Sequence, residues 1–176
     1  MTTDNIAYGT YVAMDVTNLQ SLLADNTPSL AAWQSARVPN HATLAVDYEV
    51  FVYLPTTNHA AAVDKAAYIY LVPWITTDGG TTWRTGATFG TTTLPTGTEG
   101  TASIDDPNSM KGPIASPYFV AQQIIVAEFN VAAMCGGIVP DGWSLCIRTN
   151  HATAGANIGL STGCIVAYRP ITYTNA

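Results

Sequence analysis

The chain has few charged residues, and they are scattered. Of its 176 residues, 6 are basic and 12 are acidic, so the net charge is −6. A phosphate-binding surface needs clustered lysine and arginine, so nucleic acid is not an expected partner. A soluble monomer usually carries about a quarter charged residues, but only 10% are charged here. We therefore expect part of the surface to be covered by protein.

Cysteine is also scarce. Cys135, Cys146 and Cys164 are odd in number, have no CxxC spacing and lie in or beside predicted strands. This pattern indicates reduced, buried thiols rather than a disulfide framework or a zinc site, and no cofactor is expected. Met1 is followed by polar residues, not by a basic start and a long apolar run, so we expect neither a secretory signal nor a membrane span.

What the sequence does have is period-two alternation, most clearly over Leu44–Leu54. One face of this predicted strand carries Leu44, Val46, Tyr48, Val50, Val52 and Leu54. The other face carries Asp47 and Glu49, and Pro39 and Pro55 bracket the strand. Alternation of this kind predicts a β-strand with one buried face. The acidic face is expected to meet solvent or another chain.

Similar patterns predict further strands along the chain. They cover Ile6–Met14, Ala31–Val38, Ala66–Thr76, Thr81–Thr85, Tyr118–Ala133, Trp143–Thr149 and Cys164–Tyr173. Because of Pro73, the Ala66–Thr76 strand is expected to lie at an edge or to contain a bulge. Tyr118–Ala133 is expected to be a central strand that bends or splits near Glu128-Phe129-Asn130. A short helical turn, capped near Asp15, runs to Leu23. These elements predict an all-β fold, a single β-sandwich over residues 6–176 with the jelly roll as one candidate topology, preceded by an N-terminal arm of residues 1–5.

Residues Gly86–Pro117 are rich in glycine and threonine, and no strand is expected there. A segment this long is usually functional or disordered. It is either an extended arm that orders against a neighbouring subunit or a surface loop. The candidate interface residues come from this segment and from the Ala66–Thr76 strand, which is apolar on both faces. They are Tyr68, Tyr70, Trp74, Phe89, Leu94 and Met110.

The octet Thr76–Trp83 predicts a hairpin, because Asp78, Gly79 and Gly80 favour the positive φ angles of a tight turn. It resembles the Asp-box of sialidases and related propeller proteins, in which the aspartate braces the turn and the tryptophan, here Trp83, packs beneath it. A sialidase needs several copies and an arginine cluster. This chain has one copy and four scattered arginines, so the octet predicts structure and not activity.

No constellation predicts catalysis. Gly159–Gly163 matches the G-x-S-x-G pattern, but a strand follows Ser161 and no histidine occurs after it. His41, His59 and His151 each occur as Asn-His-Ala, which favours turns over metal ligation. Asp47 and Glu49 are interpreted as an exposed pair and not as the two acids of a glycosidase. The four tryptophans, Trp33, Trp74, Trp83 and Trp143, would form either a sugar-binding platform or core and interface.

Five features of the chain are considered together: Tyr8-Gly9-Thr10-Tyr11, Asp47-Tyr48, the Asp78–Trp83 hairpin, Gly137-Ile138-Val139-Pro140 before Trp143, and Tyr168-Arg169-Pro170. In this order they resemble the capsid decoration, or cement, proteins, which are small β-rich virion proteins of tailed bacteriophages. The resemblance implies a non-enzymatic virion protein on the capsid surface that binds the major capsid protein, frequently as a trimer. The alternatives are the head of a phage fibre and a carbohydrate-binding module, both of which use β-sandwiches.

Overall fold

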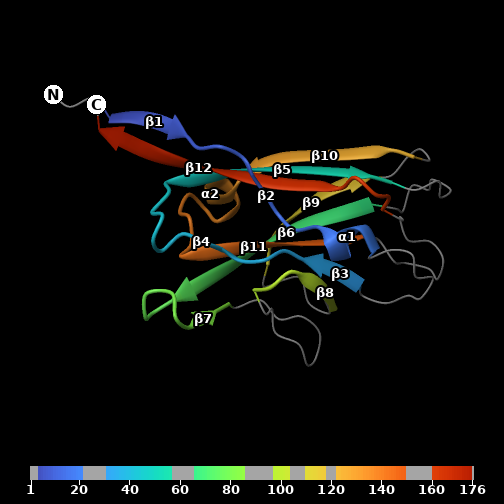
Figure 1. Ribbon diagram of the computed structural model, residues 1–176, viewed down its shortest axis with the longest axis horizontal. Coiled ribbons are helices and arrows are strands. Elements are labelled where there is room, and N and C mark those ends of the chain that lie inside the picture. The colour runs from blue at the N-terminus through green and yellow to red at the C-terminus, as the bar shows by residue number, and fades with distance from the viewer. Residues whose placement is uncertain are drawn as a thin grey trace.

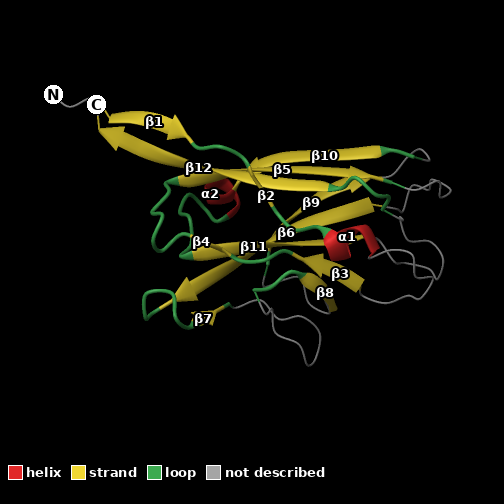
Figure 2. Cartoon of the chain, in the orientation of Figure 1, coloured by secondary structure: helices red, strands yellow, loops and turns green. Residues whose placement is uncertain are grey.

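The computed structural model describes residues 4–21, 31–56, 66–85, 97–103, 110–117, 122–149 and 160–175. These parts of the chain form two antiparallel sheets with two short helices (Figures 1 and 2). The predicted all-β class is therefore confirmed, while the β-sandwich and its jelly-roll topology stay predictions.

The first sheet has the strand order β1-β12-β5-β10, and β2 pairs with β12 beside β1. Its strands are β1 (Asp4–Tyr8), β2 (Val12–Ala13), β5 (Asp47–Pro55), β10 (Ile124–Asn130) and β12 (Ile165–Asn175). Strand β12 pairs with β5 only as far as Ile171, and Thr172–Asn175 pair with β1 alone. We call β1 together with Ile171–Asn175 the terminal ribbon, and its two-stranded part projects beyond the other strands at the upper left of Figure 1.

The second sheet has the strand order β7-β6-β11-β3-β8, with β4 paired to β11 and β9 paired to β6. Its strands are β3 (Ala31–Gln34), β4 (Val38–Pro39), β6 (Ala66–Thr76), β7 (Trp83–Arg84), β8 (Gly100–Ser103), β9 (Lys111–Pro117) and β11 (Gly142–Thr149). The predicted strand Ala66–Thr76 is confirmed from end to end. Pro73 lies between the segments of β6 that pair with β9 and with β7, so no described strand pairs with it on that side of β6, as a residue without an amide donor allows. A register shift lies nearby, between Ile69 and Leu71.

One core lies between the two sheets. Val50 and Val52 of the first sheet belong to the same buried cluster as Ile69, Leu71 and Leu145 of the second. The opposite face of β6 carries Tyr70, Val72 and Trp74, which form a second buried cluster with Cys146 and Met110. Strand β6 is therefore buried on both faces, which explains why both of its alternating sets are apolar.

The strand predicted over Leu44–Leu54 begins three residues later than expected. The buried face is as predicted from Tyr48 to Leu54, but Leu44 is 74% exposed and has a φ of 49°. The amide of Leu44 donates to the carbonyl of Asn40, and the amide of Ala45 donates to the Asn40 side chain. These bonds close a turn that ends at Leu44. The alternation of apolar and polar residues therefore extends to Leu44 in the sequence although Leu44 is not part of the strand.

The segment Tyr118–Ala133 was predicted as a central strand that bends or splits near Glu128-Phe129-Asn130, and the central position is wrong, while residues 118–121 lie outside the described part of the chain. Strand β10 starts at Ile124, and among the described residues it pairs only with β5, so it is an edge strand. It ends at Asn130, where the helical turn α2 (Val131–Met134) begins. Val131 is buried and the amide of Ala132 donates to Asp47, so tertiary contacts replace the predicted extended chain.

The expectation that Gly86–Pro117 lacks strands is also corrected. Gly100–Ser103 form β8 against β3, and Lys111–Pro117 form β9 against β6. Pairing with a preformed strand satisfies the backbone of these glycine- and proline-containing segments despite their low strand propensity. Both strands pair with other strands of the second sheet of the same chain. Residues 86–96 and 104–109 lie outside the described part of the chain.

Smaller differences occur elsewhere. The predicted first strand divides into β1 and β2 at Gly9, whose amide donates to the carbonyl of Pro170 at 2.8 Å. Ala31–Val38 divides into β3 and β4, and the last strand continues past Pro170 to Asn175. Asp4 and Asn5, which were expected in an N-terminal arm of residues 1–5, belong to β1, while residues 1–3 lie outside the described part of the chain. The helical turn is α1 (Thr17–Ser21), and Asp15 Oδ1 accepts from the Thr17 amide at its start, as predicted.

Candidate binding surface

The outward face of the first sheet changes from apolar to charged over three rows of side chains. Strand register brings together Val126, Tyr53 and Ile165 in one row, Glu128, Phe51 and Ala167 in the next, and Asn130, Glu49 and Arg169 in the third. Val126 is 55% exposed and Ile165 is 47% exposed. Within the described structure, no other element of the chain covers these two side chains enough to bury them.

Glu49 is the centre of the charged row. Arg169 donates from Nε to Glu49 Oε2 at 2.8 Å, and its Nη2 lies 2.6 Å from the same oxygen. The hydroxyl of Tyr11 donates to Glu49 Oε1 at 2.6 Å. Hydrogen bonds from Tyr11 and then from Arg169 lower the pKa of Glu49. One carboxylate is thus held ionised by a phenol and a guanidinium.

The guanidinium of Arg169 also contacts two aromatic rings. Its central carbon lies 4.7 Å from the ring centroid of Tyr8 and 4.8 Å from that of Tyr11. These are cation–π distances. The same contacts connect the charged row of the sheet to the terminal ribbon, because Tyr8 is the last residue of β1.

Glu128 is a second carboxyl group next to Glu49. Hydrogen bonding to Glu49 and repulsion by its charge raise the pKa of Glu128. Its side chain is exposed, and no ion pair to Glu128 occurs among residues whose structure is described. The cluster therefore holds two carboxyl groups and one guanidinium.

A cavity of about 440 Å³ opens beside Glu128. It is lined by Tyr11, Phe51, Glu128 and Ala167. Two aromatic rings and a methyl group supply apolar walls, and the carboxyl group of Glu128 is the acidic element. The cavity lies where the apolar and charged rows of the sheet meet.

The terminal ribbon also presents apolar side chains. Ile6 and Tyr173 are partners across the ribbon, so they share a face, and they are 59% and 62% exposed. Tyr8, on the same face of β1, is 59% exposed. In the described structure, β1 pairs only with β12, and Thr172–Asn175 of β12 pair only with β1. The ribbon therefore has an open backbone edge on each side.

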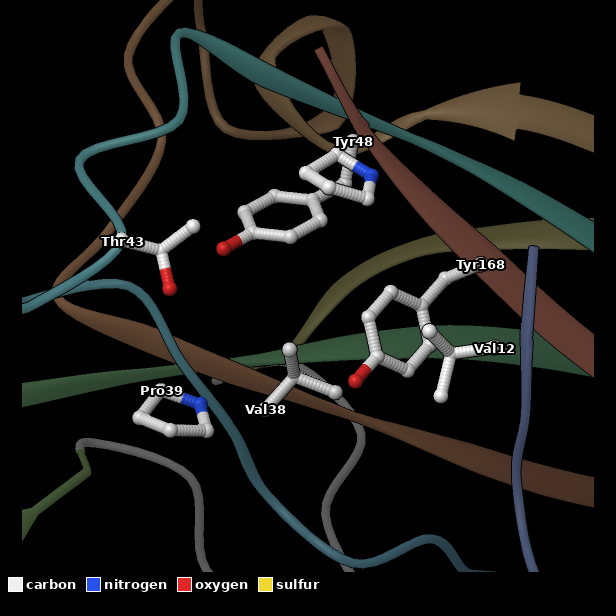
Figure 3. Close-up of a pocket in the computed structure, with 7 residues that line it drawn as sticks. Val12, Val38, Pro39, Thr43, Tyr48 and Tyr168 are labelled. Atoms are coloured by element: carbon white, nitrogen blue, oxygen red, sulfur yellow. The ribbon is translucent and has the colours of Figure 1, made fainter. Parts of the chain in front are cut away.

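A smaller cavity, of about 220 Å³, lies where β2, β4 and β12 approach one another (Figure 3). It is lined by Val12, Val38, Pro39, Thr43, Tyr48, Tyr168 and Pro170. The rings of Tyr48 and Tyr168 meet edge to face with centroids 5.9 Å apart, and each also contacts Trp143 at 5.4 Å. Burial is the first cause that raises the pKa of both tyrosines.

The predicted hairpin has the internal bonds of an Asp-box. Asp78 Oδ1 accepts from the Thr76 hydroxyl and from the amides of Thr81 and Thr82. Gly79 and Gly80 have φ angles of 68° and 95°, as the turn requires. Trp83 packs under the turn and donates from Nε1 to the Gly80 carbonyl at 2.8 Å. The return strand is shorter than predicted, because β7 covers only Trp83 and Arg84.

Three of the six expected interface residues are buried within the chain itself. Tyr70, Trp74 and Met110 are 5%, 3% and 5% exposed, and they belong to the second buried cluster. The expectation that they face a partner is therefore wrong. Tyr68 is half-buried under Arg148, whose guanidinium carbon is 5.6 Å from the ring centroid. Phe89 and Leu94 lie outside the described residues.

The tryptophans do not form a platform. Trp33 and Trp143 are fully buried, and Trp74 is nearly so. Trp83 is half-buried, because the guanidinium carbon of Arg37 lies 4.2 Å from the ring centroid and His41 meets its edge. The exposed aromatic side chains of the described structure are instead the tyrosines Tyr8, Tyr11 and Tyr173.

The other sequence motifs have local roles. Ser161 donates to the carbonyl of Pro55, and His41 packs against the hairpin, while His59 and His151 lie outside the described residues. Over the ranges that the structure describes, no three His, Cys, Asp or Glu side chains are grouped to hold a metal ion. Cys146 and Cys164 are buried, as predicted, and Cys135 is half-buried. Burial raises the pKa of Cys164 to about 11 and also raises that of Cys146.

Comparisons with known proteins identify no family model, no curated protein and no solved structure that matches the chain. In the described part of the chain, neither helix has the length and apolar character needed to span a bilayer.

The cluster around Glu49 was not predicted from the sequence. Alternation placed Glu49 on an outward face, but its partner Arg169 is 120 residues away, and Tyr11 belongs to a third segment. Arg169 was itself a signal for an ion pair, because it is an isolated basic residue in a chain with few charges. Only the strand register identifies which carboxylate it meets.

Proposed function

We propose that the chain is a non-enzymatic structural protein of a phage virion, which binds the outside of the capsid and bridges major capsid subunits. The terminal ribbon is the observation on which this proposal rests. It projects from the body of the fold, presents Ile6, Tyr8 and Tyr173, and has two open strand edges (Figure 1). An edge of this kind gains backbone hydrogen bonds when another chain adds a strand to it.

The apolar row of the first sheet supports the same proposal. Val126 and Ile165 are exposed on either side of Tyr53, and Ile124 at the start of β10 is 52% exposed. Exposed apolar side chains on one face are typical of protein contact surfaces. Several shallow contacts of this kind, repeated by the symmetry of a trimer on an icosahedral shell, would add up to stable attachment.

The proposal is tested by rebinding the protein to capsid shells from which it has been removed. The wild-type protein is expected to sediment with the shells at a copy number comparable to the major capsid protein. The double variant I6S/Y173S, which removes two partners from the ribbon face, is expected to stay in the supernatant. The control is I138S, because Ile138 is 77% exposed on the turn after α2 and not on the ribbon. Equal sedimentation of both variants would contradict the role of the ribbon.

A glycan-binding module or fibre head is the second candidate. The observation that favours it is the exposure of three tyrosines, Tyr8, Tyr11 and Tyr173, at 59%, 45% and 62%. Tyrosine rings that are partly in solvent can stack on sugar rings. Binding on a glycan array, together with failure to attach to shells, would favour this function over capsid decoration.

A further inference from the structure

We propose that the cavity lined by Tyr11, Phe51, Glu128 and Ala167 holds the guanidinium group of an arginine side chain from a partner protein. The inference rests on the proposed function only in taking the arginine from a protein. The cavity and the groups around it define the chemistry of the occupant.

The charges beside the cavity favour an added cation. Glu49 is already satisfied by Arg169 and Tyr11, with three contacts between 2.6 and 2.8 Å. Glu128 has no such cation among the residues with described positions, and its carboxyl group is exposed at the cavity. The second carboxyl group therefore leaves the cluster one positive charge short when both are ionised. An added cation would satisfy it.

The shape of the cavity favours a guanidinium. A guanidinium is planar and weakly hydrated, so it stacks on aromatic rings while donating to a carboxylate. Tyr11 and Phe51 supply rings at the cavity, and Glu128 supplies the acceptor. The chain already uses this chemistry once, since Arg169 stacks on Tyr8 and Tyr11 while donating to Glu49. The cavity volume of about 440 Å³ is large enough for a whole side chain.

The surface next to the cavity favours the stem of an arginine. Phe51 is flanked on β5 by Tyr53, and the row through Tyr53 contains Val126 and Ile165. These side chains are apolar and partly or fully exposed. The aliphatic stem of an arginine lies favourably along such a surface while its head binds a carboxylate. The acidic net charge of −6 also favours the approach of a basic residue.

The test is an NMR titration of the intact chain with N-acetyl-L-arginine amide, compared with N-acetyl-L-citrulline amide. The two probes have nearly the same shape, but citrulline carries no charge. Arginine amide is expected to give saturable shifts at the ring resonances of Tyr11 and Phe51 and at the Ala167 methyl group. Citrulline amide is expected to bind at least about tenfold more weakly, which is the effect of one charge-assisted hydrogen bond. Equal binding of the two probes would overturn the proposal.

Matched variants locate the site. E128Q keeps the size of the side chain and removes its charge, so it is expected to weaken the binding of arginine amide by about tenfold. D15N removes the same charge from an exposed carboxylate at the start of α1, outside the lining of the cavity, and is expected to bind like the wild type. Unchanged affinity in E128Q, or an equal loss in D15N, would show that the cavity does not select the cation.

The probe is a free amino-acid derivative, so the titration is independent of capsid binding. Saturable binding of arginine amide with no attachment to shells would overturn the proposed function and keep the cavity assignment. Attachment to shells with no arginine binding would overturn the cavity assignment alone.

Discussion

Arg169 and Glu49 face each other directly across the β12–β5 ladder, and the shortest nitrogen–oxygen distance between them is 2.6 Å. Between them they connect three segments of the chain, because Tyr11 donates to the same carboxylate. Glu128 on β10 adds a second carboxyl group to the cluster. The cluster therefore holds two carboxyl groups and a single guanidinium group.

Replacing Arg169 by methionine is expected to lower the thermal midpoint of unfolding. The variant loses the ion pair and the stacking on Tyr8 and Tyr11, and it leaves Glu49 beside Glu128 without a cation. R169K keeps the charge but not the planar, two-nitrogen contact, so its unfolding midpoint is expected to lie between those of the wild type and R169M. The measurement is a thermal unfolding scan at neutral pH.

The pH dependence of the same variant follows from the lowered pKa of Glu49. A carboxyl group whose pKa is lower in the folded state adds stability above its unfolded pKa, and this contribution is lost as the pH falls through the folded value. The difference between wild type and R169M is therefore expected to shrink as the pH falls below the unfolded pKa of a glutamate, which is about 4.3. Adding E128Q to R169M is expected to recover part of the loss at neutral pH. A constant difference at all pH values would contradict this account.

Asp78 is expected to titrate well below an ordinary aspartate. Hydrogen bonds from the side chain and backbone of Thr82 lower its pKa from 3.8 to about 2. The ionised carboxylate therefore stabilises the hairpin above about pH 4, and this contribution is lost as the pH falls towards about 2. A carboxyl NMR titration measures the midpoint directly. D78N keeps an acceptor for the amides of Thr81 and Thr82, so it is expected to retain the turn and lose this acid transition.

How far the sequence predicts the structure depends on where each residue finds its partner. Ala66–Thr76 and the Asp78 turn were predicted closely, because burial on both faces and local side-chain bonds are properties of neighbouring residues. The ribbon, β8 and β9 depend on pairing with distant strands, which a pattern along the chain does not contain. The same applies to the cavity at Glu128, whose lining comes from four separate segments.

The candidate interface shows the same limit on a finer scale. Alternation over β6 correctly predicted two apolar faces, but it did not show that the second face is covered by Met110 and by aromatic neighbours of the same chain. The exposed apolar residues that the structure presents instead, Val126 and Ile165, were predicted to lie in strands. Their outward direction follows from strand register.

Two leucines with opposite environments test the placement of the core. Leu71 is fully buried between the sheets, so L71A is expected to lower the free energy of unfolding by about 3 kcal/mol, within the range for buried leucine. Leu44 is 74% exposed, so L44A is expected to change it by less than about 0.5 kcal/mol. Equilibrium urea unfolding measures both. A large loss in L44A would contradict the corrected start of β5 and restore the longer predicted strand.

Asn40 is expected to be the most important polar side chain at the entry to β5. It is 7% exposed, it exchanges two hydrogen bonds with Ala45 at 2.8 and 3.2 Å, and it accepts one from the Tyr48 hydroxyl at 2.9 Å. N40A leaves the amide of Ala45 and the hydroxyl of Tyr48 without this partner, so we expect a loss of about 3 kcal/mol in the free energy of unfolding.

Y48F is the matched comparison, because it removes only the bond from the hydroxyl and is expected to cost about 1 kcal/mol. Since N40A and Y48F remove a shared contact, their effects are expected to be less than additive in the double variant. Hydrogen exchange at the Ala45 amide gives a second readout, which is expected to accelerate in N40A and to change little in Y48F. Equal acceleration in both variants would show that the Tyr48 hydroxyl, and not Asn40, closes the turn.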